Sequence, residues 1–406
     1  MEAGSELGAR QLGGFKDFCQ YAHLTRVIAG RDLLGSTGFE FAKEGAHRVF
    51  IVTDQVIRGT GLIDKVEAGV IDGGLEIAGV FDDVPQDSST EVCDRCAEEA
   101  RAAGADAFLA VGGGSVMDTA KIADSVFTHG GTARETEGFL LMPRADDGMG
   151  APLPIAPLAC IPTTAGTGSE VSMGALVKDA EAKVKLEIVD FPLFPRLAIL
   201  DPESTRTLPA SVAASTGMDA MTHALEGYVS LDGNPFQDGR ALMGLRMIRD
   251  NLERAVADTS HEEARGNMLM AASLAITHGL GAAHAMSHPC GAHFGVPHGV
   301  ANAINLPHVI RFNAAGGTDI ADRYRDLSET LGLESGGSGA EVGERLAARV
   351  EGMVERMGLP TSLSQVGVPE DGVPALAEAA MGDGLTLLNP REPSEEDYAE
   401  LFRRAL

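Results

Sequence analysis

The chain has 406 residues, of which 44% are hydrophobic and 22% charged, and its formal net charge is −27. This length favours two domains, and the composition is that of a globular protein without any apolar run of the roughly eighteen residues that a membrane span needs. The negative charge argues against binding to nucleic acid or anionic membranes, which need a basic surface, and the N-terminus lacks a secretory signal, so we expect a cytoplasmic protein.

The first half of the chain alternates apolar, β-like runs with helical segments. Such runs occur at 47–54, 75–83, 107–115, 158–164, 183–190 and 197–202. Apolar strands separated by helices are typical of a parallel sheet that is buried on both faces. From about residue 208 onward, alanine, leucine and methionine recur at helical spacing. We therefore predict a Rossmann-like α/β domain over residues 1–205 and an all-helical domain over residues 206–406.

The five cysteines are odd in number and sparse, which fits a reducing compartment better than a disulfide framework. Cys93 and Cys96 form a CxxC pair, but the surrounding residues have helical spacing. No second CxxC is present in the sequence to complete a structural zinc site. We therefore expect neither zinc binding nor redox function at this pair.

Two loops in the first half have the composition of phosphate-binding loops. The segment AVGGGSVMDTAK (110–121) runs from an apolar strand into a helix through three glycines and a serine. Backbone amides at such a helix N-terminus favour an anion, although a tight turn is the alternative interpretation. The segment PTTAGTGSE (162–170) also follows an apolar strand. Neither loop matches the GxGxxG fingerprint or the P-loop pattern.

Asp54 ends the first apolar run of the chain. At that position, an acidic side chain can accept a hydrogen bond from a ribose hydroxyl and would repel a 2′-phosphate. The alternative role for the same side chain is to cap the following helix. The residue type alone does not decide between the two.

The second half contains a cluster of possible metal ligands. Asp219 and His223 are four residues apart, so on a helix they share one face. His284 and His288 repeat this spacing, and His298 follows. One carboxylate and three imidazoles can bind a divalent cation, and imidazole favours iron, zinc or nickel. Spacing alone leaves open whether His284 or His288 is the ligand.

Taken together, these segments resemble the iron-dependent (group III) alcohol dehydrogenases. The segments GGGSVMDTAK, PTTAGTGSEV, GMDAMTHALEGY and HAMSHPCGAHFGVPHGVANA are similar to the signature blocks of that family, in the same order. The resemblance covers roughly residues 30 to 400. It implies a dehydroquinate synthase-like fold, in which an α/β domain binds NAD and a helical domain holds Fe(II), with zinc or nickel as other possible metals.

The resemblance also assigns individual residues. The two ligand histidines of the family's last block are fourteen residues apart, a separation that only His284 and His298 satisfy. It therefore implies metal binding by Asp219, His223, His284 and His298. His288 then lies where the family keeps a histidine near the nicotinamide, and we interpret it as a catalytic proton relay. The implied NAD contacts are Asp54, Gly113, Gly114, Ser115, Asp118, Thr163, Thr164 and Lys185, although Lys183 is an alternative to Lys185.

The chain departs from the family pattern at several positions. Ala275 stands where the family often has an aromatic residue, and His278 where a small apolar residue is usual. These departures predict a wider and more polar pocket. Arg144 lies in a segment, 137–154, that is longer than the usual family loop. It is a candidate for recognising an acidic substrate, and a solvated loop arginine is the alternative.

The expected function is hydride transfer between NAD(H) and a small primary alcohol or aldehyde, carried out by a homodimer or larger homo-oligomer. A hydroxyacid–oxoacid transhydrogenase of the same fold is a second interpretation. A third is a lyase that resembles dehydroquinate synthase and uses NAD and a metal without net oxidation. No nucleic-acid or membrane partner is expected.

Overall fold

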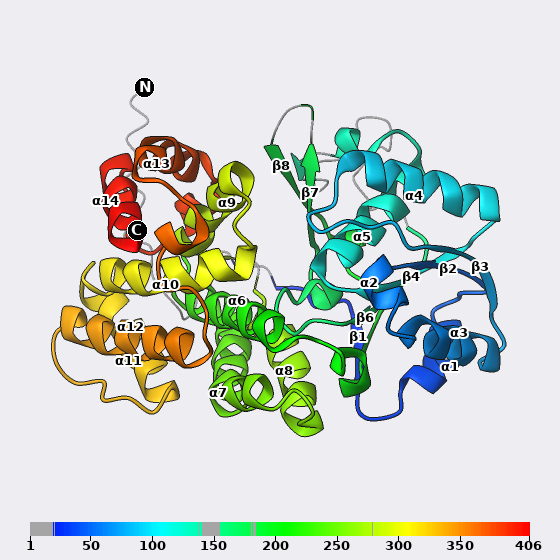
Figure 1. Ribbon diagram of the computed structural model, residues 1–406, viewed down its shortest axis with the longest axis horizontal. Coiled ribbons are helices and arrows are strands. Elements are labelled where there is room, and N and C mark those ends of the chain that lie inside the picture. The colour runs from blue at the N-terminus through cyan, green and yellow to red at the C-terminus, as the bar shows by residue number, and fades with distance from the viewer. Residues whose placement is uncertain are drawn as a thin grey trace. The chain divides into compact units, whose positions relative to one another are not determined.

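The computed structural model describes residues 19, 21–136, 138–139, 155–179, 181, 184–277 and 279–406 (Figure 1). They form two compact units. The α/β unit contains residues 22–213 and 254–273, and the helical unit contains Tyr21 with residues 214–253 and 274–406. These units are groups of residues that pack together, and each contains more than one segment of the chain. The domain boundary predicted after residue 205 remains a prediction.

The α/β unit is built on a six-stranded sheet in the order β1-β9-β6-β4-β2-β3, in which every neighbouring pair is parallel. This confirms the predicted Rossmann-like sheet. Its strands are β1 (Arg26–Ala29), β2 (Arg48–Val52), β3 (Glu76–Phe81), β4 (Ala107–Gly112), β6 (Leu158–Pro162) and β9 (Leu197–Leu200).

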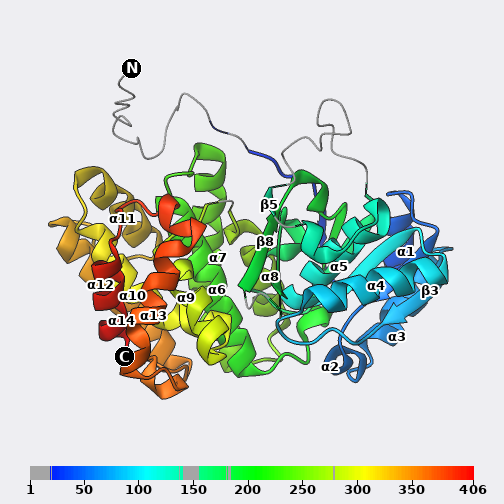
Figure 2. The same ribbon diagram turned by 90° about the horizontal axis from the view of Figure 1, so that it is seen from above.

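Helices cover both faces of this sheet, which explains why its strands are apolar throughout. Successive side chains of a strand point to opposite faces, so Phe50 and Phe108 pack with α4 and α5, while Val49 and Leu109 pack with α1 and α3. Helices α4 and α5 lie side by side on their face of the sheet (Figure 2). These helices are α1 (Thr37–Ala42), α3 (Leu62–Asp72), α4 (Thr90–Ala103) and α5 (Gly114–His129), and a short α2 (Gln55–Arg58) follows β2.

The run predicted at 183–190 is a strand, but it lies in a second, three-stranded sheet. This sheet contains β5 (Gly138–Phe139), β8 (Val184–Val189) and β7 (Gly174–Asp179) in that order. Strands β7 and β8 are antiparallel, and their register pairs Lys178 with Lys185. Charged and apolar residues alternate in KVKLEIVD, which is the pattern of a strand with one exposed face.

The helical unit confirms the helical character predicted for the second half of the chain. Its helices are α6 (Ala210–Val229), α7 (Pro235–Ala257), α9 (Ala282–Phe294), α10 (His298–Ala314), α11 (Thr318–Thr330), α12 (Gly339–Arg356), α13 (Val373–Gly382) and α14 (Glu395–Ala405), while most of α8 (Glu262–Ala275) belongs to the α/β unit. Helix α10 packs against α9, α12 and α14. In the part of the chain that the structure describes, no helix combines the length and hydropathy that a membrane crossing requires.

A short turn between α9 and α10 separates two of the predicted ligand histidines. Gly295 ends α9 in the left-handed conformation, at φ +67°, where a side chain would be strained. Pro297 then precedes α10, and its fixed φ suits a helix start. His298 is thus the first residue of a helix whose direction differs from that of α9.

Candidate functional site

The four predicted metal ligands come together in the helical unit. Asp219 and His223 lie one turn apart on α6, His284 lies near the start of α9, and His298 begins α10. Asp219 Oδ1 is 3.9 Å from His223 Nε2, 3.7 Å from His284 Nε2 and 3.5 Å from His298 Nε2. Histidine nitrogens from three helices therefore lie within 3.9 Å of one carboxylate oxygen.

The chemistry of these donors fits a divalent cation. Asp219, His223 and His284 are buried, and candidate ligand atoms of these three residues lie within 4.8 Å of one another. Burial opposes ionisation of Asp219, but the neighbouring histidines outweigh it and hold the pKa of this carboxyl well below its usual range. An ionised carboxylate among imidazoles is a ligand set that suits iron, zinc or nickel.

His284 and His288 have different surroundings, although they lie on the same face of α9. His284 Nε2 faces Asp219, whereas His288 Nδ1 lies 2.7 Å from Asp383 Oδ2. Burial opposes ionisation of Asp383, yet the contact with His288 lowers the pKa of this carboxyl, so the carboxylate accepts and Nδ1 carries the hydrogen. The His288 ring stacks on His298, with centroids 5.4 Å apart. This geometry favours His284 over His288 as the ligand.

Glu226 is a further candidate residue of this site, which the ligand pattern of the sequence does not reveal. It lies on α6, and its side chain is 3% exposed. Glu226 Oε1 accepts a hydrogen bond from Ala283 N at 2.6 Å, and Oε2 lies 2.6 Å from His284 Nδ1. Because a carboxylate only accepts, Nδ1 of His284 carries the hydrogen, and Nε2 is the atom that would bind a cation. The sequence carries one clue to this contact. Glu226 follows Asp219 by seven residues, so on a helix the two side chains share a face.

The predicted cofactor loops lie at the carboxyl edge of the six-stranded sheet. From β2 the chain continues to β3 on one side, and from β4 it continues to β6 on the other. The carboxyl ends of β2 and β4 therefore flank a topological switch point, which is where doubly wound sheets bind ligands. Asp54 lies two residues after the end of β2, and Gly113 directly follows β4.

The glycines after β4 allow the two predicted loops to approach each other closely. A Cβ at Gly113 would lie 3.4 Å from Thr164 Cγ2, and a Cβ at Gly114 would lie 2.7 Å from Thr167 Cγ2. Gly113 precedes α5 and has no side chain that could cap the first amides of this helix. Thr163 continues the second loop, and its amide donates to Gly112 O at 3.0 Å.

Ser115 and Lys185 both contact Asp87, a residue that the sequence analysis did not single out. Asp87 N donates to Ser115 Oγ at 3.1 Å, and Asp87 Oδ1 lies 3.4 Å from Lys185 Nζ. Lys178 Nζ lies 3.1 Å from Asp87 Oδ2. The structure thus brings Ser115 and Lys185 to one place, although they are distant in sequence.

Asp118 and Asp54, two of the predicted cofactor-binding residues, accept hydrogen bonds from other residues of the protein. Asp118 Oδ1 accepts from Ser169 Oγ at 2.7 Å, and Asp118 Oδ2 accepts from Leu176 N at 3.1 Å. Asp118 therefore ties α5 to the second loop and to β7. Asp54 Oδ1 accepts from Ile57 N at 2.8 Å, which is the helix-capping role that the sequence left as an alternative.

Among the positions that depart from the family pattern, the structure describes Ala275. Ala275 is fully buried, and the widening predicted from it remains a prediction. His278, Arg144 and Lys183 lie outside the described residues.

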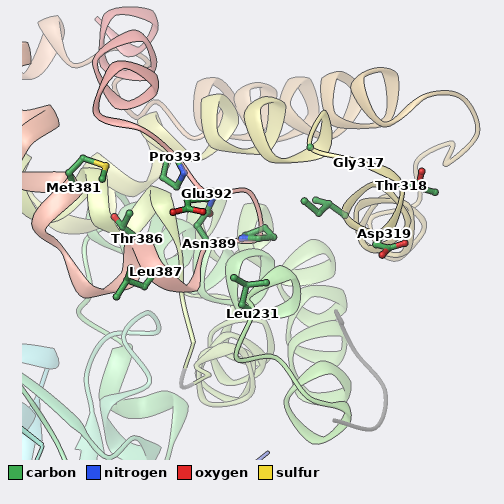
Figure 3. Close-up of a pocket in the computed structure, with 13 residues that line it drawn as sticks. Leu231, Gly317, Thr318, Asp319, Met381, Thr386, Leu387, Asn389, Glu392 and Pro393 are labelled. Atoms are coloured by element: carbon green, nitrogen blue, oxygen red, sulfur yellow. The ribbon is translucent and has the colours of Figure 1, made fainter. Parts of the chain in front are cut away.

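A cavity of about 700 Å³ lies elsewhere in the helical unit, between the start of α11 and the chain before α14 (Figure 3). None of the predicted site residues lines it. Its carboxylates, Asp319 and Glu392, come from these two segments, and the amide of Asn389 is engaged by Asn313 and by Ala282 N. The cavity therefore offers no set of converging polar groups comparable to the cluster around Asp219.

Comparison with known proteins shows the family to which the chain belongs. Residues 25–202 match the family described as iron-containing alcohol dehydrogenase, and residues 213–406 match the Fe-containing alcohol dehydrogenase family, C-terminal. The chain belongs to the iron-containing alcohol dehydrogenase family. It is an oxidoreductase that interconverts alcohols and aldehydes with a nicotinamide cofactor and a metal.

Relatives of known activity align with this family member over most of their length. The NAD-dependent methanol dehydrogenase of Bacillus methanolicus is 33% identical, over 93% of this chain and 97% of the relative. The 1,3-propanediol dehydrogenase of Klebsiella pneumoniae is 37% identical, over 89% and 92%. A crystal structure of 1,3-propanediol oxidoreductase superposes with a TM-score of 0.89 at 33% identity, covering 96% of this chain and all of that one.

Replacing Glu226 with glutamine will weaken metal binding. Glutamine can still accept from Ala283 N, but its amide nitrogen would face His284 Nδ1 and favour the tautomer whose Nε2 carries hydrogen. We expect the affinity for Fe(II) or Zn(II), measured by competition with a chelator, to fall about 10- to 100-fold. Glu378→Gln, at an exposed position of α13, should retain the affinity of the parent. Equal affinity of E226Q and the parent would contradict the role given to Glu226.

Proposed function

We propose that this enzyme is an NAD-dependent, iron-dependent dehydrogenase of small primary alcohols, with Asp219, His223, His284 and His298 as the metal ligands. The observation that carries the proposal is the convergence of these four donors from α6, α9 and α10. When bound, a divalent cation supplies Lewis acidity, which makes an alcohol easier to deprotonate and a carbonyl easier to reduce.

The remaining chemistry is assigned to the chain's own side chains. Glu226 holds His284 in the tautomer that a ligand needs. His288 donates through Nδ1 to Asp383, so its Nε2 is the atom that takes up the proton released when an alcohol is oxidised. In the direction of aldehyde reduction, the same nitrogen returns the proton.

The α/β unit binds NAD in this proposal. The amides at the start of α5 and the hydroxyls of Ser115, Thr163 and Thr164 bind the diphosphate and ribose, and Lys185 adds a positive charge. Asp54 caps α2 and keeps a carboxylate beside the switch point. That charge would repel the 2′-phosphate of NADP, so we propose NAD as the preferred cofactor.

The substrate proposed is a short primary alcohol or diol, in line with the methanol and 1,3-propanediol named for the relatives. The homodimeric or larger assembly and the cytoplasmic location expected from the sequence remain predictions.

The proposal is tested by NADH formation from NAD with protein that has been loaded anaerobically with iron or zinc. A panel of methanol, ethanol, 1-propanol, 1,3-propanediol and 2-hydroxyacids should give turnover with the short alcohols or diols, and metal-free protein should give none. Protein that holds metal and NAD but forms no NADH would contradict the proposal. Activity that appears only after an oxoacid acceptor is added would indicate the transhydrogenase instead.

His284 and His288 should respond differently to replacement by alanine. His284→Ala removes a ligand, so the purified variant should contain little metal. His288→Ala leaves the ligands in place, and we expect it to retain metal while turnover falls about 100-fold or more, the usual contribution of a general base. Metal analysis and steady-state kinetics on both variants provide the measurements. If both keep full metal and full rate, the two assignments are wrong.

Asp54→Asn should shift the cofactor preference. Asparagine retains the helix cap but loses the charge, so the ratio of kcat/KM for NADPH to that for NADH should rise on the order of tenfold, equivalent to about 1.4 kcal/mol. Asp72→Asn, at an exposed position of α3, is the matched control and should leave the ratio unchanged. An unchanged ratio in D54N would show that Asp54 does not determine the cofactor preference.

A further inference from the structure

Asn302 lies against the metal site without belonging to the predicted ligands. It is on α10, one turn after His298, and its side chain is fully buried. Asn302 Nδ2 donates to Asp219 Oδ1 at 2.8 Å. The same nitrogen lies 3.3 Å from His284 Nε2 and 3.2 Å from His298 Nε2. The amide head is therefore in contact with three of the four proposed ligands.

The contact with Asp219 is the one that an amide nitrogen can keep when a cation is bound. A bound cation uses the Nε2 lone pairs of His284 and His298, so neither can accept from Asn302 in that state. Asp219 is ionised and has more than one lone pair on each oxygen, so it can accept from the amide and bind a cation at the same time. A charge-assisted hydrogen bond of this kind fixes the direction of the carboxylate.

Burial leaves one of the two polar atoms of the Asn302 side chain without a partner in the described part of the chain, as it does for Asn305 on the same helix. Asn302 Oδ1 is buried and has no hydrogen-bond partner among the described residues. Leaving a buried amide oxygen unpaired costs free energy that an apolar residue of similar size would avoid. The amide nitrogen, with Asp219 as its acceptor, is the part of the side chain that compensates for this cost.

We propose that Asn302 is a positioning residue of the metal site, which holds the Asp219 carboxylate against the three histidines and thereby sets the affinity for the cation. This inference rests on the proposed ligand set. It adds a residue that the histidine and carboxylate pattern of the sequence does not reveal.

The matched pair of variants is Asn302→Leu and Asn305→Leu. Asn305 is also fully buried on α10, and its amide donates to Ser287 Oγ at 3.2 Å rather than to a proposed ligand. We expect N302L to bind Zn(II) or Co(II) about 10- to 100-fold more weakly in chelator competition, and to change the visible spectrum of the Co(II)-loaded protein. N305L should keep the parent affinity and spectrum.

A second variant covers the case in which N302L does not fold. Asn302→Asp places a second carboxylate beside Asp219, which is repulsive without a cation and favourable with one. Its melting temperature without metal should therefore be lower than that of the parent, and the rise on adding Zn(II) should be larger. A rise no larger than in the parent would overturn the inference, as would parent-like affinity in folded N302L or an equal loss in N305L.

His284→Ala separates this inference from the proposed function. If His284→Ala loses metal while N302L binds as the parent does, only the role of Asn302 is wrong. If His284→Ala itself retains full metal, the ligand set is wrong, and the role of Asn302 falls with it.

Discussion

The carboxylate of Glu226 joins α6 to the start of α9, and the geometry of the proposed metal site depends on this connection. The first amides of a helix have no partner within the helix, and Glu226 accepts from two of them, at Ala283 and His284. It also accepts from the His284 ring. A buried charge is tolerated only when it is well paired, and these three donors provide that pairing. One side chain thus contacts the start of a helix and sets the orientation and tautomer of a proposed ligand, His284.

Much of this arrangement was accessible from the sequence because it depends on local periodicity. The apolar runs predicted the parallel sheet, and the four-residue spacing of Asp219 and His223 placed both on one face of a helix. The same rule could not separate His284 from His288, which share a face. Their difference comes from partners 58 and 95 residues away, Glu226 and Asp383. Spacing along one helix carries no information about such contacts.

The two predicted phosphate-binding loops show a similar limit to what the sequence reveals. Their glycines were recognisable because exposed backbone amides at a helix N-terminus suit an anion. The charged residues of the same segment were harder to interpret. Lys121 is fully buried, and its amine donates to Ser172 O, Ser172 Oγ and Gly174 O, while Asp118 is engaged by Ser169 and Leu176. These side chains form hydrogen bonds with the second loop and with the residues that follow it. Nothing in the order of residues distinguishes that structural role from contact with a ligand.

The distribution of the proposed ligands over three helices has a consequence for the protein's lifetime. A cation held by Asp219 and His298 joins parts of the chain that are 79 residues apart, much as a covalent cross-link would. Because metal affinity is then part of the free energy of folding, loss of the cation lowers the stability of the helical unit as well as abolishing turnover. A cell that runs short of iron would therefore hold fewer active molecules and would also clear the empty ones faster.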